Sequence, residues 1–327
     1  MPEGLAGEGR LLAGFDAGQT HTTCRLARLH GDGRLSVIGE GQGPGVSHLA
    51  AAGAEQRFAA ALSGSLGQAI VGHGWSDLAA AAVGASGIEQ GAAAQQRGVA
   101  LAAAALGLPA QRVVVTGDER TALRGALGDR QGPGVGIVVI SGTGCIALGR
   151  NAAGREHRCG GWGWLLDRAG SACDIGRDAL ALSLEMADGR RPDSPLRQAI
   201  WSRLAPRVTA QQIKALVVDP GFGAAGFARL APTVDALAAA GDADAQAVLA
   251  DSARGLGVLV RGVAAALGLE RARVCGLGGA LSHLPRFAAA YGTALQQDLP
   301  GAVPVAAQGD ACQGALWLAA ETLLRPG

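Results

Sequence analysis

Short apolar runs alternate with alanine-rich segments along the first part of the chain, and most of the runs end at glycine and small polar residues. Compact apolar runs rich in β-branched residues favour strands, whereas apolar positions repeated at helical spacing favour helices. The pattern therefore predicts strands at residues 11–15, 24–29, 34–40, 78–84 and 112–116. It predicts helices at residues 49–70, 91–106 and 119–127, several of them bounded by glycine or proline.

The rest of the chain continues the same alternation. Strands are predicted at residues 136–140, 146–149 and 273–276. Helices are predicted at residues 175–186, 208–218, 233–240, 245–267, 284–295 and 311–324. Because strands and helices mix in both halves and the strands end in glycine-rich turns, we expect an α/β protein with functional loops at strand ends. A length of 327 residues predicts two domains.

Composition removes several classes of function. Only 17% of residues are charged and the net charge is +1, which argues against a nucleic-acid partner. No apolar segment has the pattern of a membrane span, and residues 1–10 lack the apolar run of a signal peptide. The six cysteines form no CxxC pair and are expected to be reduced thiols of a cytoplasmic protein. The Ala/Gly-rich helices would permit a homodimer.

The turn Asp16–Thr22 is the first candidate for chemistry, because it joins two predicted strands. Gly18 lets the backbone approach a ligand closely, and Thr20 and Thr22 can donate hydrogen bonds to phosphate oxygens. Asp16 can hold Mg²⁺ through water, since this ion takes few carboxylates and keeps several waters. The same pattern also fits an ordinary polar hairpin without a ligand.

A second turn of the same kind, Ser141–Gly144, follows an apolar strand in the second half. Two such turns in corresponding places favour phosphate binding and suggest two related lobes that face each other across a cleft. Gly278 and Gly279 follow another strand and can lie against an adenine or a ribose. They lack the GxGxxG spacing of a dinucleotide site, and the P-loop pattern is absent from the chain.

Asp118 stands between a predicted strand and a predicted helix. A kinase needs a carboxylate within hydrogen-bond reach of the attacking hydroxyl, and a strand end is a rigid place for one. The same position also suits a structural role as the N-cap of the helix that follows. The two glycine turns favour the catalytic interpretation.

Together these motifs resemble the ATPase core shared by actin and the sugar kinases. More narrowly, residues 83–87, 160–163, 170–171 and 175–177 resemble the N-acetylglucosamine kinase family, which is joined to the ATPase activators of benzoyl-CoA reductase and 2-hydroxyacyl-CoA dehydratases. The resemblance runs from about residue 11 to about residue 320. Its most specific part is Gly160-Gly161-Trp162-Gly163 with the Gly-Ser and Ile-Gly-Arg stretches that follow.

The resemblance implies two ribonuclease-H-like lobes with an interlobe cleft, residues 1–118 with 305–327 and residues 119–304. It implies ATP and Mg²⁺ as cofactors, Asp118 as the general base, and phosphorylation of a small-molecule sugar, N-acetylglucosamine or glucosamine. The nucleotide-binding residues would be Asp16, Gly18, Gln19, Thr20, Thr22, Gly142, Thr143, Gly144, Gly278 and Gly279. The sugar-binding residues would be Ser47, His48, Ser86, Gly161, Trp162, Gly163, Asp167 and Arg168.

Three residues depart from the family pattern. Arg168 stands where the family has a sugar-binding aspartate, with Asp167 one position early; Ser47 and Gly117 stand where asparagines are usual. Either Asp167 takes over the role of that aspartate through a local shift, or the substrate differs. An arginine would suit a carboxylated sugar such as N-acetylmuramate, because guanidinium pairs with carboxylate in a bidentate manner. The sequence fits an ordinary solvent-facing Arg168 equally well. The sequence also leaves open an ATPase activator with an Fe–S cluster and a sugar sensor without catalysis.

Overall fold

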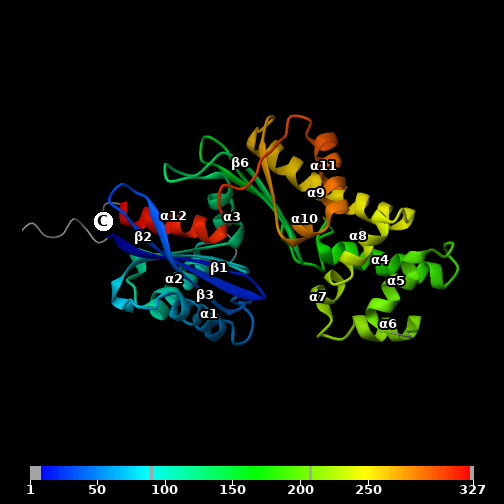
Figure 1. Ribbon diagram of the computed structural model, residues 1–327, viewed down its shortest axis with the longest axis horizontal. Helices are drawn as coiled ribbons and strands as arrows, with labels where there is room; N and C mark the ends of the chain where they lie inside the picture. Colours follow the sequence, from blue (N-terminus) through cyan, green and yellow to red (C-terminus); the bar gives the residue numbers. More distant parts are fainter. Residues whose placement is uncertain (1–8, 89–90, 169, 206–207, 325–327) are drawn as a thin grey trace, which may run out of the picture. The chain divides into compact units, whose positions relative to one another are not determined.

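The computed structural model describes residues 9–88, 91–168, 170–205 and 208–324. Two compact units make up the chain: residues 1–135 with 306–327, and residues 136–305 (Figure 1). The first unit is thus completed by the end of the chain. The boundary expected after residue 118 lies inside this unit, because the helix that follows Asp118 packs against the C-terminal helix.

Within the described residues of the first unit, five strands form one mixed sheet in the order β3-β2-β1-β4-β5. β1 is antiparallel to β2, and β2 to β3, whereas β4 and β5 run parallel to β1. The strands are β1 (Arg10–Ala17), β2 (His21–Leu29), β3 (Leu35–Pro44), β4 (Leu78–Ala85) and β5 (Val113–Thr116).

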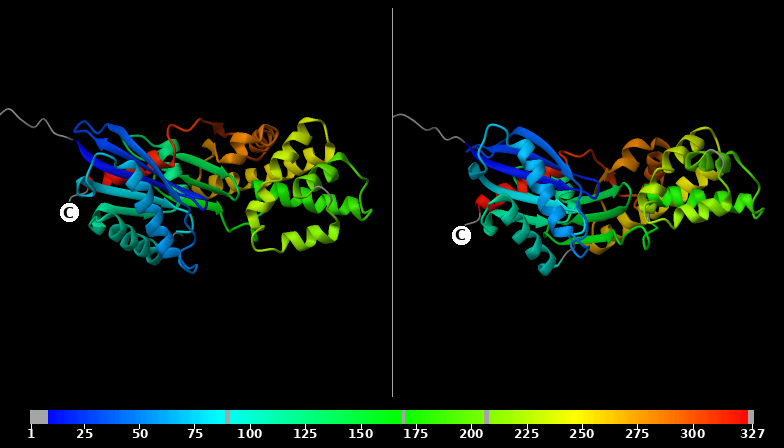
Figure 2. Two further views of the ribbon diagram at one scale, coloured as in Figure 1. Left: turned by 60° about the horizontal axis from the view of Figure 1, so that its bottom comes forward. Right: turned by 90° about the horizontal axis from the view of Figure 1, so that it is seen from below.

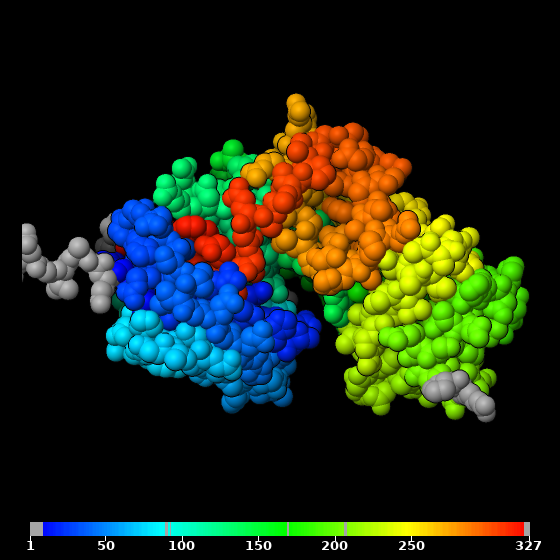
Figure 3. Space-filling view, in the orientation of Figure 1, coloured from blue at the N-terminus to red at the C-terminus, as the bar shows by residue number. Residues whose placement is uncertain are grey.

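Helices cover both faces of this first sheet. They are α1 (Ala54–Ala69), α2 (Ala92–Leu106), α3 (Asp118–Leu127) and α12 (Ala311–Leu324), with short 3-10 turns η1 (Trp75–Asp77) and η2 (Ala110–Arg112). Alternate strand residues face opposite sides, as the pleat of a strand requires. Phe15 packs with the cluster of α1 and α2, whereas Leu12 packs with α12. Figure 2 shows the ribbon of α12 (red) beside the first strands (blue). In Figure 3 the C-terminal residues (red) accordingly lie beside the N-terminal strands (blue).

The sheet of the second unit repeats the topology of the first. In its described residues the order is β10-β9-β6-β7-β8. Read from the β8 edge, β8, β7 and β6 are antiparallel neighbours, and β9 and β10 then run parallel to β6. The strands are β6 (Gly136–Ser141), β7 (Cys145–Arg150), β8 (Glu156–Gly160), β9 (Arg273–Leu277) and β10 (Val303–Pro304). The turns after β1 and β6 therefore occupy equivalent positions in two related sheets.

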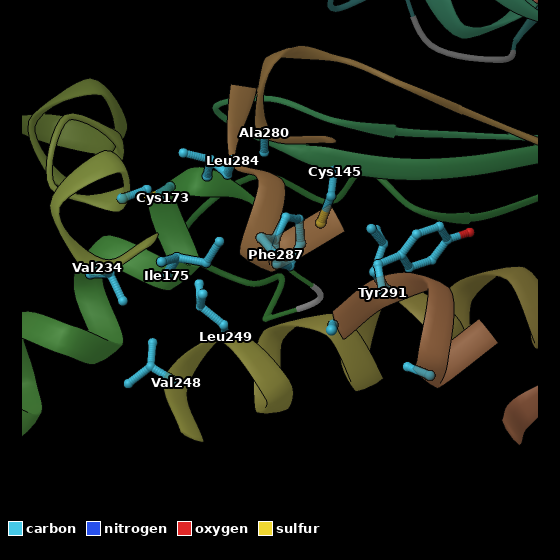
Figure 4. Close-up of a cluster of buried hydrophobic side chains, with 14 of the residues drawn as sticks. Cys145, Cys173, Ile175, Val234, Val248, Leu249, Ala280, Leu284, Phe287 and Tyr291 are labelled. Atoms are coloured by element: carbon cyan, nitrogen blue, oxygen red, sulfur yellow. The ribbon is translucent and has the colours of Figure 1, made fainter. Parts of the chain in front are cut away.

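A large apolar cluster joins this second sheet to its helices. The helices are α4 (Ala172–Ala187), α5 (Pro195–Leu204), α6 (Ala210–Val217), α7 (Gly223–Ala228), α8 (Ala231–Ala239), α9 (Ala243–Leu267), α10 (Gly279–His283) and α11 (Pro285–Asp298). In Figure 4, Phe287 of α11 lies among Cys145, Ile175 and Leu249, which come from β7, α4 and α9. No helix among the described residues is both long and apolar enough to cross a membrane.

The predicted strands and longer helices are present, with ends that differ by a few residues. Five short elements differ from the expectations: β8, β10, α5, α7 and α10. β8 has the mainly polar sequence EHRCG, and β10 has two residues, so neither shows a strand pattern. α5 does carry a start signal, because Ser194 accepts a hydrogen bond from the N–H of Leu196 and proline opens the helix.

Candidate active site

The turn between β1 and β2 is tightened by its own backbone. The N–H of Gly18 donates to the carbonyl of His21 at 3.0 Å, and Gln19 and Thr20 at the tip are exposed. Thr22 departs from the phosphate-binding expectation. Its side chain is fully buried, and its hydroxyl donates to the carbonyl of Pro44 at 2.9 Å. Exposed donors at this turn therefore come from Gln19 and Thr20, and Thr22 holds the turn against β3.

Two other segments meet this turn. The N–H of Val46 donates to the carbonyl of Gly18, and the N–H of Ser86 donates to the carbonyl of Ala17, both at 2.9 Å. A Cβ on Gly87 would come within 2.7 Å of the Cα of His48, so the end of β4 also touches the loop that precedes α1. The first unit thus brings together the predicted phosphate turn and three predicted sugar-binding residues, Ser47, His48 and Ser86.

Ser47 has a partner that the sequence did not indicate. Arg57, in the first turns of α1, donates from Nε and a terminal nitrogen to the Ser47 hydroxyl at 3.3 and 2.9 Å, and to the carbonyl of Ala52 at 2.8 Å. A hydroxyl that accepts twice from a guanidinium has its own proton left to donate. Ser47 is therefore free to donate this proton, and the positive charge of Arg57 lies beside it.

Asp118 opens α3 directly after β5. Register explains why it lies close to the phosphate turn: Asp16 of β1 pairs with Gly84 of β4, and Gly84 pairs with Thr116 of β5. The Thr121 hydroxyl donates to the carbonyl of Asp118 at 2.9 Å and fixes the first turn of the helix. The carboxyl ends of parallel strands meet at one edge of a sheet, which is the usual place for ligands in α/β proteins.

Burial and neighbouring charge make Asp118 an unusual carboxylic acid. Burial first, and then the negative charges of Glu119 and Asp16, raise its pKa to about 7. Burial also raises the pKa of Asp16, an effect that His21 opposes and Asp310 reinforces. A carboxylate whose pKa lies near neutrality is a much stronger base than a solvated one, so this environment suits proton abstraction.

Asp310 supplies charge from the segment that enters α12. It accepts both terminal nitrogens of Arg25 at 2.7 and 2.8 Å and the N–H of Gln313 at 2.8 Å. Although burial opposes ionisation, these hydrogen bonds hold the pKa of Asp310 below its ordinary value. Asp310 therefore stays charged, and its pairing with Arg25 joins the segment before α12 to β2.

The second unit carries the equivalent turn after β6. The N–H of Gly142 donates to the carbonyl of Gly144 at 2.8 Å, and Thr143 between them is exposed. A Cβ on Gly142 or Gly144 would meet nothing within 4 Å, so the tip is open. Gly278 has a φ of 93° and lies so close to the backbone of Ser141 that a side chain would overlap it. The predicted phosphate turn and the predicted adenosine turn are therefore neighbours in this unit.

The start of α4 lies on the same turn. The Ser141 hydroxyl donates to the carbonyl of Gly170 at 2.7 Å, and the N–H of Ala172 donates to the carbonyl of Gly142 at 2.8 Å. Ser171 caps the helix and forms a reciprocal capping box with Asp174. The Gly-Ser stretch that marks the family resemblance is therefore a helix start packed against the second phosphate turn.

The glycine–tryptophan loop is held by Asp167. One carboxylate oxygen of Asp167 accepts the N–H of Trp162 at 2.5 Å, while Gly161 and Gly163 adopt φ values of 76° and 90° that favour glycine. Trp162 is 64% exposed, and the guanidinium carbon of Arg158 lies 4.7 Å from its ring centroid. The loop thus presents an aromatic face that is not packed into the core.

Arg168 is exposed and lies near Asp178. Its side chain is 75% exposed, and its terminal nitrogen lies 3.6 Å from a carboxylate oxygen of Asp178. A surface ion pair of this length contributes little to stability. Two other arginines touch predicted sugar-binding residues: Arg57 donates to Ser47, and Arg158 lies over the ring of Trp162.

The donor chemistry available for a metal is modest. Within the described part of the chain, no three His, Cys, Asp or Glu side chains come together as a metal site. Asp16 at the phosphate turn offers one half-buried carboxylate. This set fits Mg²⁺ that arrives with nucleotide phosphates, because that ion takes one or two carboxylates and keeps several waters.

Known proteins resemble this chain in sequence and in fold. A family model described as the BadF/BadG/BcrA/BcrD ATPase family matches residues 13–319. An N-acetylmuramic acid/N-acetylglucosamine kinase of Clostridium acetobutylicum is 29% identical over 210 residues, 64% of this chain and 67% of that enzyme. An N-acetyl-D-glucosamine kinase of Dictyostelium discoideum is 36% identical over 143 residues, 43% of this chain and 44% of that enzyme.

A solved structure from Chromobacterium violaceum, assigned as an N-acetylglucosamine kinase, superimposes with a TM-score of 0.69 at 30% identity and covers 95% of this chain and 99% of that one. The two sheets of equal topology and this likeness confirm the predicted α/β fold of the actin-like ATPase type. Because the family model spans nearly all of the described residues, the chain belongs to the BadF/BadG/BcrA/BcrD ATPase family.

Proposed function

We propose that this protein is an ATP-dependent kinase that phosphorylates a hydroxyl group of an amino sugar, N-acetylglucosamine or glucosamine. The observation that carries the proposal is Asp118, a half-buried carboxyl with a pKa of about 7 beside the turn that follows β1. The kinases similar in sequence agree with it. The six cysteines, which all lie in the described residues, are free thiols, as a cytoplasmic location would require.

Asp118 acts as the general base in this mechanism. The sugar hydroxyl oxygen bonds to the γ-phosphorus of ATP while the bond from that phosphorus to the β-phosphate oxygen breaks and ADP leaves. The hydroxyl proton passes to the Asp118 carboxylate. A base whose pKa lies near the working pH gives the best balance between the fraction ionised and the strength of the base.

Exposed donors at the two equivalent turns bind the phosphates. In the first unit these belong to Gln19 and Thr20, and in the second to Thr143 and Gly144, while Gly18 and Gly142 shape the turns through their own backbone hydrogen bonds. Gly278 and Gly279 lie beside the second turn and receive the adenosine. Asp16 would hold Mg²⁺ together with the phosphates, and the ion would neutralise charge on the transferred group.

The loop before α1 binds the sugar, with Ser47 as a donor towards a sugar oxygen and with His48 and Ser86 beside it. In the second unit, Trp162 offers its aromatic face to the sugar ring, and Asp167 keeps that loop in place. Arg168 is left out of this proposal because it is turned to Asp178.

One observation favours a carboxylated amino sugar as a second candidate. Arg57 touches Ser47 and forms no ion pair among the described residues, so its charge is available to an acidic substituent. The Clostridium relative is named for N-acetylmuramic acid as well as N-acetylglucosamine. Either substrate would use the same base and the same phosphate turns.

The test is ADP release from Mg-ATP with N-acetylglucosamine, glucosamine, N-acetylmuramate and glucose, on the wild type and on Asp118→Asn. We expect turnover with an amino sugar and a loss of roughly 10²–10⁴-fold in kcat in the variant, the usual scale of a general base. Asp219→Asn is the matched control, because it makes the same change at an exposed loop residue. Full activity of Asp118→Asn would refute the assignment.

The same panel separates the two substrates. If N-acetylmuramate is the substrate, Arg57→Met should raise its KM at least tenfold and leave the KM for N-acetylglucosamine within a factor of about three, because a charged hydrogen bond contributes more than a neutral one. Equal effects on both sugars would mean that Arg57 only holds the loop.

A further inference from the structure

Gly117 and Glu119 flank the proposed base, and the side chain of Glu119 occupies the space left empty by the glycine. Gly117 is the N-cap of α3, and it has no side chain with which to cap the helix. A Cβ on Gly117 would overlap the carboxylate oxygens of Glu119 and lie 2.5 Å from its carbon Cδ. The Glu119 side chain therefore folds back and fills the volume in which an N-cap side chain would stand.

Glu119 is buried although it carries a charge. The residue is 6% exposed, and its carboxylate lies 3.8 Å from a terminal nitrogen of Arg120. Burying a carboxylate is costly unless nearby groups compensate, and a helix N-terminus favours negative charge. Glutamate side chains are usually exposed to solvent, and the burial of this one beside Asp118 suggests that it acts on Asp118.

Glu119 also contacts the base itself. Its carboxyl lies beside the Asp118 carboxyl, so the two can share a hydrogen bond when one of them is protonated, while Thr121 fixes the Asp118 backbone. The other charge that faces Asp118 comes from Asp16 on β1, and Asp16 is faced in turn by His21 and Asp310. Among these described groups, Glu119 is therefore the one placed to accept the proton of Asp118 in a hydrogen bond.

We infer that Glu119 is a positioning residue for phosphoryl transfer: its carboxylate takes the place of an N-cap side chain and, by filling that volume, limits the orientations open to the Asp118 carboxylate that accepts the hydroxyl proton. After the transfer the proton stays on Asp118, which donates a hydrogen bond to Glu119. Glycine at position 117 leaves room for this arrangement, because a side chain there would move the carboxylate of Glu119 from its place. The inference rests on the proposed function of Asp118.

The experiment uses the full chain, Mg-ATP and the sugar with the highest turnover. Glu119→Gln keeps the shape of the side chain and removes its charge, and Glu270→Gln makes the same change at an exposed residue of the second unit. We expect Glu119→Gln to lower kcat by roughly 10–100-fold, the scale of a misplaced catalytic group, with both KM values within about threefold. The acid limb of the kcat/KM profile should move to lower pH, because a negative charge beside Asp118 is lost.

Measuring Asp118→Asn in parallel distinguishes a failure of the proposed function from a failure of the inference about Glu119. If Asp118→Asn is active, the proposed function fails. If Asp118→Asn is inactive while Glu119→Gln matches Glu270→Gln in kcat and in acid limb, the inference about Glu119 fails alone.

A second pair of variants tests the shared volume even if Glu119→Gln folds poorly. Gly117→Asn should lower the thermal midpoint, because asparagine and Glu119 compete for one space. The double variant Gly117→Asn/Glu119→Ala should regain that midpoint, because asparagine is a good N-cap. Losses that simply add in the double variant would overturn the arrangement.

Discussion

At the scale of single residues, the environment that makes Asp118 a strong base also lowers the stability of the folded protein. Its pKa is about 7 in the folded protein and 3.8 in an ordinary setting, so the folded state binds the proton more tightly. The free energy of unfolding must then fall as pH rises from about 4 to about 7, because the unfolded chain gains more by ionising. The buried base is therefore least favourable for folding at the pH where it works best.

Asp118→Asn should remove this pH dependence. We expect the variant to be more stable than the wild type at pH 8 by roughly 1–4 kcal/mol, and similar to it near pH 4. Urea unfolding at the two pH values measures the difference, and Asp219→Asn should follow the wild type. A stability profile of Asp118→Asn parallel to that of the wild type would show that the carboxyl ionises freely in the folded state.

Individual residues were predictable where chain neighbours determine their place. Asp16 and Asp118 follow or end apolar strands, and the sequence placed both at a sheet edge. Thr22 was assigned to phosphate, but strand alternation turns it inward to Pro44. Arg57 and Glu119 escaped notice because their roles depend on how a long side chain bends back, which no sequence spacing encodes.

At the scale of elements, α3 and α12 cross where both carry glycine. A Cβ on Gly125 would overlap the carbonyl of Asp310, and one on Gly314 would overlap the carbonyl of Thr121. The close approach sets the start of α12, and with it Asp310, against the helix that begins with Asp118. This crossing therefore connects packing to the charges around the proposed base.

Gly125→Ala should destabilise the protein by roughly 1–3 kcal/mol, because an added methyl group has nowhere to go in a tight crossing. Gly64→Ala is the control: this exposed glycine of α1 has nothing within 4 Å of its Cβ position, so alanine should stabilise the helix by about 0.5–1 kcal/mol. Chemical denaturation of both variants gives the comparison. Equal effects of the two substitutions would contradict a backbone contact at Gly125.

Helices and strands differ in how far their own sequence determines them. The central strands consist of apolar residues, many of them β-branched, and are legible in the sequence. β8 is polar and becomes a strand because it pairs with β7, a tertiary cause. α5 illustrates a readable signal, the Ser194-Pro195 start, in a segment whose weak apolar periodicity hides the helix.

At the scale of the whole molecule, the chain builds two sheets of one topology and returns to finish the first. The apolar cluster of the second unit is made wholly of residues between 136 and 305. In the first unit, Leu12, Ala80 and Ala82 are covered by Leu316 and Ala319 of α12. The first crossing, at residues 135–136, follows the polar, glycine- and proline-rich stretch 128–134, which is a linker signal in the sequence. The return at residues 305–306 lies in an apolar stretch, so nothing in the local composition marks it.

This difference predicts that the first unit needs the distant residues 306–327 to fold, whereas the second unit needs only its own continuous segment. Residues 136–305, produced alone, should unfold cooperatively in urea, since their core is complete. Residues 1–135 alone should leave one face of the sheet bare, bind the dye ANS and lose cooperativity. Residues 1–135 joined to 306–327 by a flexible Gly/Ser linker should recover a cooperative transition, because α12 again buries Leu12 and its neighbours. If residues 1–135 unfold as cooperatively without α12 as with it, the C-terminal helix is an accessory to the first unit and not part of its core.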